Sequence, residues 1–433
     1  MNQPTSFSNI SRRTLLKGAA ATPIVLGANA LANPLRREGP IRVGLVGCGG
    51  RGTGAALQAM MVDQDVALVA LADLFPGRIE PTIKRLKAAL TEEAIGEDRT
   101  SRIQVDEAHS FTGLDSYKQL IDAVDVVLLA TPPVFRPMQM RAAVEAGKHV
   151  FAEKPFAVDA PGVRSVLETA ALAREQKLSL VSGFCWRYNL RHRALFEKVH
   201  EGAVGDVRAF YSTYLASPNR IVEREAGWSD VEFHIRNWYH TLWVSGDHVV
   251  EQAIHSLDKQ AWAFGDVAPL RVTANGGRQT RTAGNIWDHF AATFDYPDGA
   301  KAFHTCRQSE NCDYDNNDWL WGTKGDAVIN NWAPHHEITG ENAWIYEGEG
   351  NDMYQEEHDE LFASVVSGEP INDGEWAARS TMLGIMTRMS AYSGKSITWE
   401  QAMESEERLG PDPIELGDFE LRAPAVPGKT PFI

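Results

Sequence analysis

The sequence is poor in cysteine and has no long apolar run. Its four cysteines, Cys48, Cys185, Cys306 and Cys312, form no paired spacing of the kind that binds metals. Cys306 and Cys312 are close enough in the chain to bridge, but free thiols fit the sequence equally well. The modest apolar run at residues 18–31 is too short and too weak to anchor the chain in a bilayer, and no later segment approaches a spanning length. These absences argue against a cysteine-based metal site and against a membrane anchor.

Positive charge is also scarce. The chain has 42 lysines and arginines against 58 aspartates and glutamates, so its formal net charge is -16 and its isoelectric point is near 5.3. Such a chain does not bind nucleic acids or anionic membranes non-specifically, because like charges repel. Hydrophobic residues make up 43% of the 433, which is ample for a core, and the length favours two domains plus a leader.

The first 40 residues predict a targeting signal followed by a linker. Arg12 and Arg13 form a twin-arginine pattern ahead of the apolar run, and the small residues at 28–32 offer A-x-A cleavage sites. We therefore expect residues 1–32 to be a twin-arginine signal peptide, residues 33–40 to be a linker, and the protein to be periplasmic or secreted. Because this route carries folded proteins, a cofactor would be bound before export.

A glycine-rich turn follows the first predicted strand, Ile41–Val46. In this G-x-G-x-x-G pattern Gly47 permits a tight turn, Gly49 lets the backbone approach a pyrophosphate, and Gly52 lets the next helix pack closely on the strand. The helix predicted at residues 53–61 would offer free N–H groups and a partial positive charge to the phosphates. The motif predicts a dinucleotide site.

A carboxylate in the expected place supports this interpretation. Asp73 ends a second predicted strand, residues 66–72, about 20 residues past the last glycine, where it can bind the ribose hydroxyls of adenosine. The same carboxylate would repel a 2′-phosphate, which favours NAD over NADP, although Arg78 could soften that repulsion.

Strands and helices alternate through residues 41–185. The further strands of this part are predicted at residues 124–130, 148–152 and 178–182, and its further helices at residues 76–90, 116–123, 135–146 and 160–176. Such alternation is typical of a doubly wound parallel sheet, an α/β fold whose ligands lie beyond the carboxyl ends of the strands.

The second half of the chain has a different pattern. Longer alternating strands are predicted at residues 206–215, 271–275, 286–296 and 300–308, and helices at residues 247–264, 354–367 and 375–393. This half is therefore expected to be an α+β domain with an antiparallel or mixed sheet.

Two groups of residues carry acid–base chemistry. Lys154, between Glu153 and Pro155 at a strand end, would have a lowered pKa beside a positively charged nicotinamide and could exchange a proton with a reacting oxygen. A structural ion pair is the alternative. Glu251 and His255 are four residues apart and would share one helix face, so that the carboxylate orients the imidazole.

A metal site at the same helix is an alternative with less support. His248 falls on the same predicted face as Glu251 and His255, so one face could supply three ligands. The spacing matches no standard motif, and a polar helix face satisfied by its neighbours explains it as well. We expect no metal.

Together the glycine-rich turn, Asp73, Thr131-Pro132, Glu153-Lys154-Pro155 and the helix with Glu251 and His255 resemble the Gfo/Idh/MocA oxidoreductases, in particular their twin-arginine-exported branch. The resemblance covers almost all of residues 41–400. It implies a Rossmann domain, residues 41–185, and a C-terminal substrate and oligomerisation domain, residues 186–433, built on a large open sheet. A sugar or polyol would bind in the cleft between them, and a homo-oligomer, a dimer or tetramer, is expected.

The resemblance also implies roles for single residues. Lys154 would stand at the hydride-transfer site, and His255 would be the acid–base group, oriented by Glu251 where the family usually has Asp. The residues expected to bind the cofactor are Gly47, Gly49, Gly50, Arg51, Gly52, Asp73, Thr131, Pro132, Glu153, Lys154, Trp186 and Arg187. Arg136 departs from the family's T-P-x-x-x-H pattern, in which this position is a histidine.

The expected function is NAD-dependent oxidation of a hydroxyl of a sugar, glycoside or polyol. Outside the cytoplasm a freely exchanging cofactor would be lost, so the cofactor is expected to be tightly bound and restored in each turnover. Paired oxidation and reduction of two substrates meets this condition, and so does glycoside cleavage by transient oxidation and elimination. The Glu153-Lys154-Pro155 motif favours the first alternative. A non-catalytic sugar-binding protein is disfavoured, because Lys154 and His255 are both present.

Overall fold

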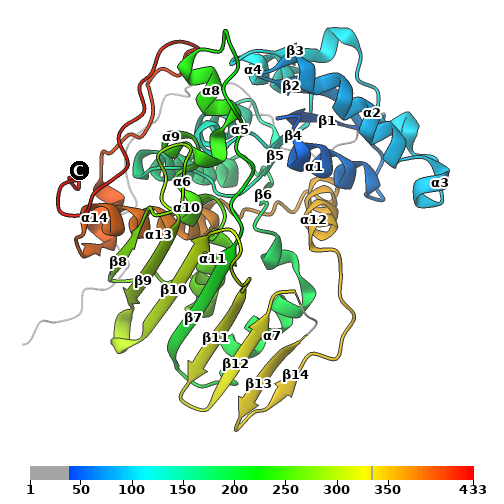
Figure 1. Cartoon of the computed structure of the whole chain (residues 1–433). Coiled ribbons are helices and arrows are strands. Elements are labelled where there is room, and N and C mark those ends of the chain that lie inside the picture. The colour runs from blue at the N-terminus through cyan, green and yellow to red at the C-terminus, as the bar shows by residue number, and fades with distance from the viewer. Residues whose placement is uncertain (1–38, 333–334) are drawn as a thin grey trace, which may run out of the picture.

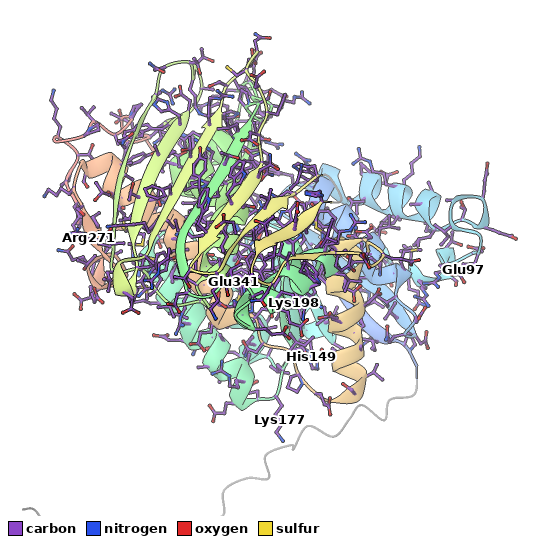
Figure 2. All side chains as sticks on the ribbon, turned by 90° about the horizontal axis from the view of Figure 1, so that it is seen from below. Glu97, His149, Lys177, Lys198, Arg271 and Glu341 are labelled. Atoms are coloured by element: carbon purple, nitrogen blue, oxygen red, sulfur yellow. The ribbon has the colours of Figure 1, made fainter. Side chains whose placement is uncertain are left out.

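The computed structural model describes residues 39–332 and 335–433, which form two sheets with helices packed on them (Figure 1). The predicted signal peptide, and the predicted linker apart from its last two residues, lie outside the described residues. Figure 2 shows Glu97, in the first part of the chain, on one side of the molecule and Arg271, in the second sheet, on the opposite side.

The first sheet has six parallel strands in the order β3-β2-β1-β4-β5-β6. The strands are β1 (Ile41–Val46), β2 (Val66–Asp73), β3 (Ser110–Thr112), β4 (Val126–Leu129), β5 (His149–Ala152) and β6 (Leu180–Ser182). The central strand β4, VVLL, is buried along its whole length, as expected for a parallel strand covered on both faces. This sheet confirms the predicted α/β architecture, and only the short edge strand β3 had no counterpart in the sequence pattern.

Helices cover both faces of the first sheet. One face carries α1 (Gly50–Met61), α2 (Ile79–Ala89) and, from the far end of the chain, α12 (Met353–Ser367). The other face carries α4 (Ser116–Ala123), α5 (Arg136–Glu145) and α6 (Ala160–Glu175), and α13 (Gly374–Ser393) packs against α6. The short helix α3 (Glu92–Ile95) lies beyond α2. Two helices from the C-terminal part of the chain, α12 and α13, thus join the helices that cover the first sheet.

The second sheet has nine strands in the order β14-β13-β12-β11-β7-β10-β9-β8-β15. The strands are β7 (Val207–Ala216), β8 (Arg271–Gly277), β9 (His289–Asp295), β10 (Lys301–Gln308), β11 (Asn317–Gly322), β12 (Gly325–Asn330), β13 (His336–Gly340), β14 (Trp344–Ile345) and β15 (Ile397–Thr398). Only the pair β7 and β10 is parallel, so the sheet is mixed, as predicted. Helices α7 (Leu190–His200), α11 (Ile254–Ala263) and α13 pack against it.

The helix predicted at residues 247–264 is broken, and that prediction was wrong. The chain forms α10 (His248–Glu251) and α11, separated by Gln252 and Ala253. Buried Asp247, at a φ of 80°, fixes the start of α10, because its carboxylate accepts hydrogen bonds from the Trp287 backbone (2.9 Å) and the Tyr392 hydroxyl (2.5 Å). These long-range contacts outweigh the local preference for one continuous helix. Glu251 ends α10 and His255 lies in the first turn of α11, so the two do not share one helix face.

A segment of the second half lies over the first sheet. Helix α8 (Asp230–Arg236) is followed by a 3₁₀ turn at Trp238–His240 and by α9 (Leu242–Ser245). After α14 (Trp399–Glu404) the C-terminal chain, red in Figure 1, runs back beside α8. There the Gly417 carbonyl accepts a hydrogen bond from the Val231 N–H (3.1 Å), and the Phe419 N–H donates to the Asp230 carboxylate (3.1 Å).

Two further findings concern the predicted absences. None of the helices in the described residues is both long and apolar enough to cross a membrane. All four cysteines are free thiols, with Cys306 buried and Cys312 exposed, so these two are not bridged.

Candidate active site

A cavity of about 330 Å³ opens at the carboxyl ends of β1, β2 and β4. The predicted cofactor residues that line it are Gly47, Gly49, Gly50, Arg51, Gly52, Asp73, Thr131 and Pro132. Its opposite wall comes from the second half of the chain, at Ile235, Arg236, Trp238 and Tyr239. The structure therefore brings together eight of the twelve residues predicted to bind the cofactor.

The glycine-rich turn has the geometry that a dinucleotide needs. Gly47 has a φ of 99°, and a side chain there would collide with the Ala130 carbonyl group at 2.8 Å. A Cβ on Gly52 would lie 1.9 Å from the carbonyl oxygen of Gly47, so only glycine lets α1 approach the strand this closely. A Cβ on Gly49 would meet nothing within 4 Å, which leaves open space above the turn for a phosphate. The residues present fit the cofactor.

Asp73 is fixed at the edge of this cavity. Its carboxylate accepts hydrogen bonds from the backbone N–H groups of Cys48 (2.7 Å) and Phe75 (2.8 Å). Burial raises the pKa of Asp73, against the opposing effect of these two bonds and of Arg78 and Arg236. Arg236 reaches this position from α8, with its guanidinium 3.7 Å from the centre of the Phe75 ring.

Lys154 meets the second half of the chain at Glu251. Its Nζ donates to the Glu251 carbonyl (2.7 Å) and lies 3.5 Å from the Glu251 carboxylate. Burial raises the pKa of Tyr239, with Glu251 and Glu153 as the next causes, so this tyrosine on the cavity wall lies in the field of both carboxylates. The Lys154–Glu251 contact thus connects the two predicted catalytic segments beside the cofactor cavity.

Arg136, which stands where the family has histidine, holds the neighbouring turns together. It is buried and donates to the carbonyls of Pro155 (2.6 Å) and Thr131 (2.6 Å). Burial lowers its pKa to about 10, while Glu153 and Glu251 act in the opposite direction. The side chain therefore fixes the strand ends after β4 and β5 and adds positive charge beside Lys154.

His255 is a neutral imidazole in this setting. Burial and the positive charges of Lys154 and Lys259 hold its pKa well below the usual range. Its Nδ1 has no hydrogen-bond partner among the described residues, and its ring lies edge-on to Phe184 at 6.2 Å. A neutral ring nitrogen near Lys154 can accept a proton from a substrate hydroxyl.

His248 lies apart from these groups. It is buried against Phe290 with a ring distance of 5.2 Å, and the charged and titratable groups that act on it are Arg281, His304, Asp288 and His289. Within residues 39–332 and 335–433 no cluster of three or more His, Cys, Asp or Glu has a geometry that could hold a metal ion.

Arg51 connects the cofactor turn to a residue that the sequence analysis missed. Its guanidinium donates to Glu153 and to Glu357 of α12 (3.0 Å), and it lies 4.9 Å over the ring of Tyr354. Glu357 is fully buried, and burial raises its pKa well above the usual range. No local pattern marks Glu357, because it reaches Arg51 only through the packing of α12 on α1.

Trp186 and Arg187 do not line the cofactor cavity, contrary to the prediction. Arg187 lies between the rings of Trp262 (4.8 Å) and Trp376 (4.3 Å). Its guanidinium donates to the carboxylates of Asp258 and Asp266, which makes it part of a buried ion-pair group. Trp186 is buried against His192 and Trp332, with ring distances of 4.7 and 5.3 Å.

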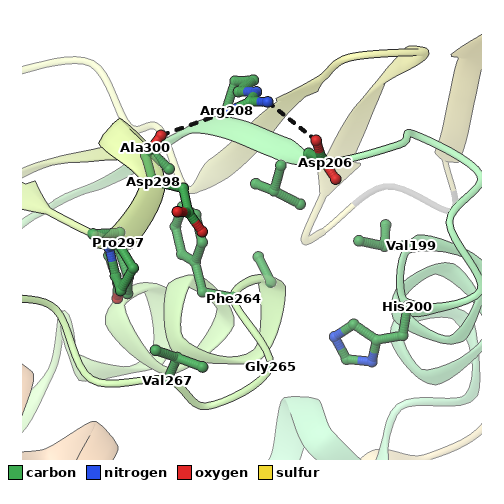
Figure 3. A pocket seen from close by; sticks show the side chains of 13 residues that line it. Val199, His200, Asp206, Arg208, Phe264, Gly265, Val267, Pro297, Asp298 and Ala300 are labelled. Atoms are coloured by element: carbon green, nitrogen blue, oxygen red, sulfur yellow. Dashed lines mark hydrogen bonds and ion pairs between the residues drawn. The ribbon is translucent and has the colours of Figure 1, made fainter. Parts of the chain in front are cut away.

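A larger hollow of about 580 Å³ lies elsewhere, between the C-terminal ends of α7 and α11 and the β9–β10 hairpin. Figure 3 shows its wall, with Arg208 bonded to the Asp206 carboxylate and to the Asp298 carbonyl. It contains none of the residues predicted to be catalytic or to bind the cofactor, so the smaller cavity is the candidate active site.

The fold and the cavity define a dinucleotide-dependent oxidoreductase. Residues 41–184 match the family described as "Oxidoreductase family, NAD-binding Rossmann fold", and residues 192–328 match the "GFO/IDH/MocA C-terminal domain". The chain therefore belongs to the Gfo/Idh/MocA family. This membership confirms the predicted family, the NAD-binding Rossmann domain and the second domain.

Curated relatives are similar over part of their length. The dTDP-3,4-didehydro-2,6-dideoxy-alpha-D-glucose 3-reductase of Actinomadura kijaniata is 30% identical over 190 residues, 43% of this chain and 49% of the relative, so the match spans about half of that protein. Inositol 2-dehydrogenase of Rhizobium meliloti (strain 1021) is 25% identical over 298 residues, 68% of this chain and 77% of the relative.

A solved structure has the same fold. The aldose-aldose oxidoreductase from Caulobacter crescentus, complexed with glycerol, superposes with a TM-score of 0.64 and 19% identity, covering 83% of this chain and 99% of that chain. At this identity the likeness shows the fold alone.

Proposed function

We propose that this protein oxidises a hydroxyl of a sugar, glycoside or polyol with an NAD held in the cavity of the first sheet. The observation that carries the proposal is the contact between Lys154 and Glu251 beside that cavity. Through this contact Lys154 of the Rossmann half lies next to the segment that bears His255, and the proposal assigns acid–base roles to both. The named sugar and polyol enzymes among the relatives support the substrate class.

When bound, the nicotinamide ring supplies hydride acceptance. The chain's own groups handle the proton: Lys154 or His255 takes it from the substrate hydroxyl as the hydride leaves the carbon. Glu251 orients Lys154 through its carbonyl and carboxylate oxygens. Burial and neighbouring cations hold the pKa of His255 low, so its ring is neutral and keeps one unprotonated nitrogen for the substrate proton, although the same effects make it a weaker base than a free imidazole.

We propose NAD rather than NADP as the resident cofactor. The Asp73 carboxylate lies at the end of β2, held by two backbone N–H groups, where a 2′-phosphate would meet negative charge. Arg78 and Arg236 lie near and weaken this repulsion. Mass spectrometry of nucleotide released from the denatured protein decides the matter, and recovery of NADP(H) would overturn the assignment.

We propose further that the cofactor is tightly bound, loaded before twin-arginine export, and active in the periplasm or outside the cell. Support comes from the wall formed by α8 and the following turn, which closes the cavity opposite the glycine-rich turn. The C-terminal segment holds this wall in place through the hydrogen bonds of Gly417 and Phe419. We propose that these contacts slow the release of the nucleotide.

A homo-oligomer is proposed from the outer face of the second sheet. A row of paired residues crosses that face, Thr293, Phe303, Tyr211, Trp319, Val328, Glu337 and Ile345. Phe303, Val328 and Ile345 are among the exposed large apolar residues of the described chain. A long exposed apolar row of this kind is typical of a contact with another copy.

The test of the activity follows the bound nicotinamide. Purified protein given a sugar should show one reduction of its bound NAD and then stall, until a ketone or acceptor sugar restarts it. Repeated cleavage of a glycoside without an acceptor and without net change in absorbance would instead assign the protein to glycoside cleavage by transient oxidation. No absorbance change and no cleavage with a broad panel of sugars, glycosides and polyols would contradict both.

A further inference from the structure

A second cavity lies at the ends of strands in the second sheet. It has a volume of about 340 Å³ and lies at the end of β7, beside the loops that flank β11 and β12. This volume falls within the range of about 300–1,000 Å³ that is common for small-molecule sites. No part of it belongs to the cofactor cavity, whose lining residues are entirely different.

Two aromatic rings in its wall are unusually exposed. Tyr314 is 72% exposed and Trp332 is 68% exposed, the highest values among the large apolar residues of the described chain. Neither ring hangs freely, because the Tyr314 hydroxyl is bonded to the Ser217 hydroxyl (2.5 Å) and Trp332 packs edge-on against Trp186 (5.3 Å). Fixed aromatic rings that remain open to solvent indicate a surface that binds something apolar on one side.

The remaining lining is polar and equally well fixed. Asn317 donates from its amide to Asp315 (2.6 Å), and Asn316 accepts two hydrogen bonds from the Asn331 amide, 2.7 Å to its carbonyl and 3.2 Å to its side chain. With Asn330, three amide side chains therefore edge the cavity. An amide group carries two N–H donors and one acceptor, which matches the mixed donor and acceptor character of sugar hydroxyls.

One residue links this cavity directly to the catalytic helix. The carbonyl of Thr213 accepts a hydrogen bond from the hydroxyl of Ser256, the neighbour of His255 (3.2 Å), while the Thr213 hydroxyl accepts one from the Asn317 N–H (3.1 Å). The next residue, Tyr214, lines the cavity. Burial raises the pKa of Tyr214 with Glu251 as the next cause, so its ring lies in the field of the catalytic carboxylate.

We propose that this cavity is a second sugar subsite, in which the non-reacting ring of a disaccharide or glycoside packs on Trp332 and Tyr314. The inference rests on the proposed sugar-oxidising function and narrows its substrate to molecules of at least two rings. The C–H face of a pyranose, which is weakly positive, packs on the electron-rich faces of the two aromatic rings. Its hydroxyls exchange hydrogen bonds with the side chains of Asn316, Asn317 and Asn330, while the reacting ring lies at Lys154 and His255.

Calorimetric titration of the cofactor-loaded protein tests the subsite without relying on turnover. Cellobiose, maltose and lactose are compared with glucose and galactose. The unaltered protein should bind at least one two-ring sugar roughly tenfold more tightly than its component monosaccharides. Trp332→Ala and Tyr314→Ala should each reduce this difference severalfold and leave monosaccharide affinity unchanged, whereas Trp332→Phe, which keeps a ring, should preserve most of it.

Several outcomes would overturn the subsite. Equal affinities for one-ring and two-ring sugars would do so, as would failure of every two-ring sugar to bind, or an equal loss of both affinities in Trp332→Ala. A change of oligomeric mass in Trp332→Ala with unchanged sugar selectivity would assign the rings to a subunit contact instead. If two-ring sugars bind with the expected selectivity but never change the nicotinamide absorbance or undergo cleavage, the subsite stands and the proposed oxidoreductase function fails.

Discussion

At the scale of single residues, the site depends on how Lys154 is held. Its Nζ is anchored by the carbonyl and carboxylate of Glu251, which come from a different half of the chain. The carboxylate adds charge stabilisation, while the carbonyl sets the direction of the Nζ hydrogens. The shorter contact is made by the backbone carbonyl of Glu251, which any residue at this position would supply. The change from the family's usual Asp to Glu therefore does not affect the main contact with Lys154.

Replacing Lys154 should abolish most of the activity and little of the fold. We expect Lys154→Ala to keep its bound nucleotide and to lower turnover by roughly 10²–10⁴-fold, the usual contribution of one proton-transfer group. Stopped-flow absorbance of the nicotinamide measures this. Lys148→Ala is a matched control. Lys148, just before β5 of the first sheet, also donates to a backbone carbonyl, that of Val124 (2.7 Å). Near-normal turnover in Lys154→Ala would make Lys154 a structural ion pair.

A buried histidine gives a residue-scale prediction about pH. Burial lowers the pKa of His304 to about 3 from its ordinary 6.5, and its Nδ1 is bonded to the Ser212 hydroxyl (2.8 Å). Because the folded pKa is the lower one, the neutral ring contributes stability above pH 6.5, and this contribution is lost as the pH falls from 6.5 toward 3.

The expected loss in the free energy of unfolding follows from the same difference between the folded and unfolded pKa. Between pH 6.5 and 5 the free energy of unfolding should fall by about 2 kcal/mol more in the unaltered protein than in His304→Asn. Urea unfolding at pH 7.5, 6.5 and 5 measures the difference between the two proteins. Parallel curves for the two across this range would show that His304 is protonated as easily in the folded as in the unfolded state.

At the scale of elements, the wall that closes the cofactor cavity depends on the C-terminal segment. The ring of Phe419 packs against His234 (6.3 Å) and Trp243 (5.9 Å), while its N–H binds the first residue of α8. The carbonyls of Arg422 and Ala425 continue this attachment by accepting from Asn285 (3.0 Å) and Trp287 (3.3 Å). Helix α8 is thus held from outside by a segment that has no helix or strand of its own.

Loosening this attachment should release the cofactor. Phe419→Ala removes a large partly buried ring, at a cost of up to about 3–5 kcal/mol in a full core site, and part of that loss is expected to fall on the closed position of α8. We expect the rate of NAD dissociation, measured from nicotinamide fluorescence after dilution into excess scavenger enzyme, to rise at least severalfold. Leu416→Ala, at a 49% exposed position of the same segment, should leave the rate unchanged. Equal rates in all three proteins would remove the C-terminal segment from cofactor retention.

At the scale of the whole molecule, the nine-stranded sheet has one face covered by helices and a second face that bears the exposed row of Phe303, Val328 and Ile345. Nine strands make a wide and regular surface, and the strand pairing aligns these side chains across the six strands from β10 to β14. Their alignment follows from strand register, because Tyr211, Trp319 and Glu337 pair with these residues and complete the row.

Charge placed in this row should separate the subunits. We expect Phe303→Asp, alone or with Ile345→Asp, to reduce the mass seen by light scattering to that of one chain, with circular dichroism unchanged. Val426→Asp serves as the control, because Val426 is a 48% exposed apolar residue of the C-terminal segment, outside the sheet. An unaltered protein that already has the mass of one chain would contradict the proposed oligomer.

The sequence by itself determined the first domain and its cofactor turn. Runs such as VVLL at Val126–Leu129 are buried on both faces of a parallel sheet, and the local pattern is sufficient to recognise them. The glycine-rich turn is equally local, because Gly47 and Gly52 are needed for backbone contacts within one strand–turn–helix unit. Asp73 lies at the end of β2, as the local pattern indicated, because the strand that carries it pairs directly with β1.

Only the tertiary structure decided which distant side chains reach that turn. Arg187 follows β6 as the pattern suggested, but two buried carboxylates, Asp258 and Asp266, hold it away from the cofactor. Glu357 and Arg236 join the site from α12 and α8. No local pattern could show this, since their contacts with Arg51 and Phe75 join parts of the chain that are far apart in sequence and depend on how the helices pack. The helix break between Glu251 and His255 has the same origin. The buried carboxylate of Asp247 accepts hydrogen bonds from Trp287, just before β9, and from Tyr392 of α13. Local spacing describes a single element, whereas a site between two domains is set by the packing of both.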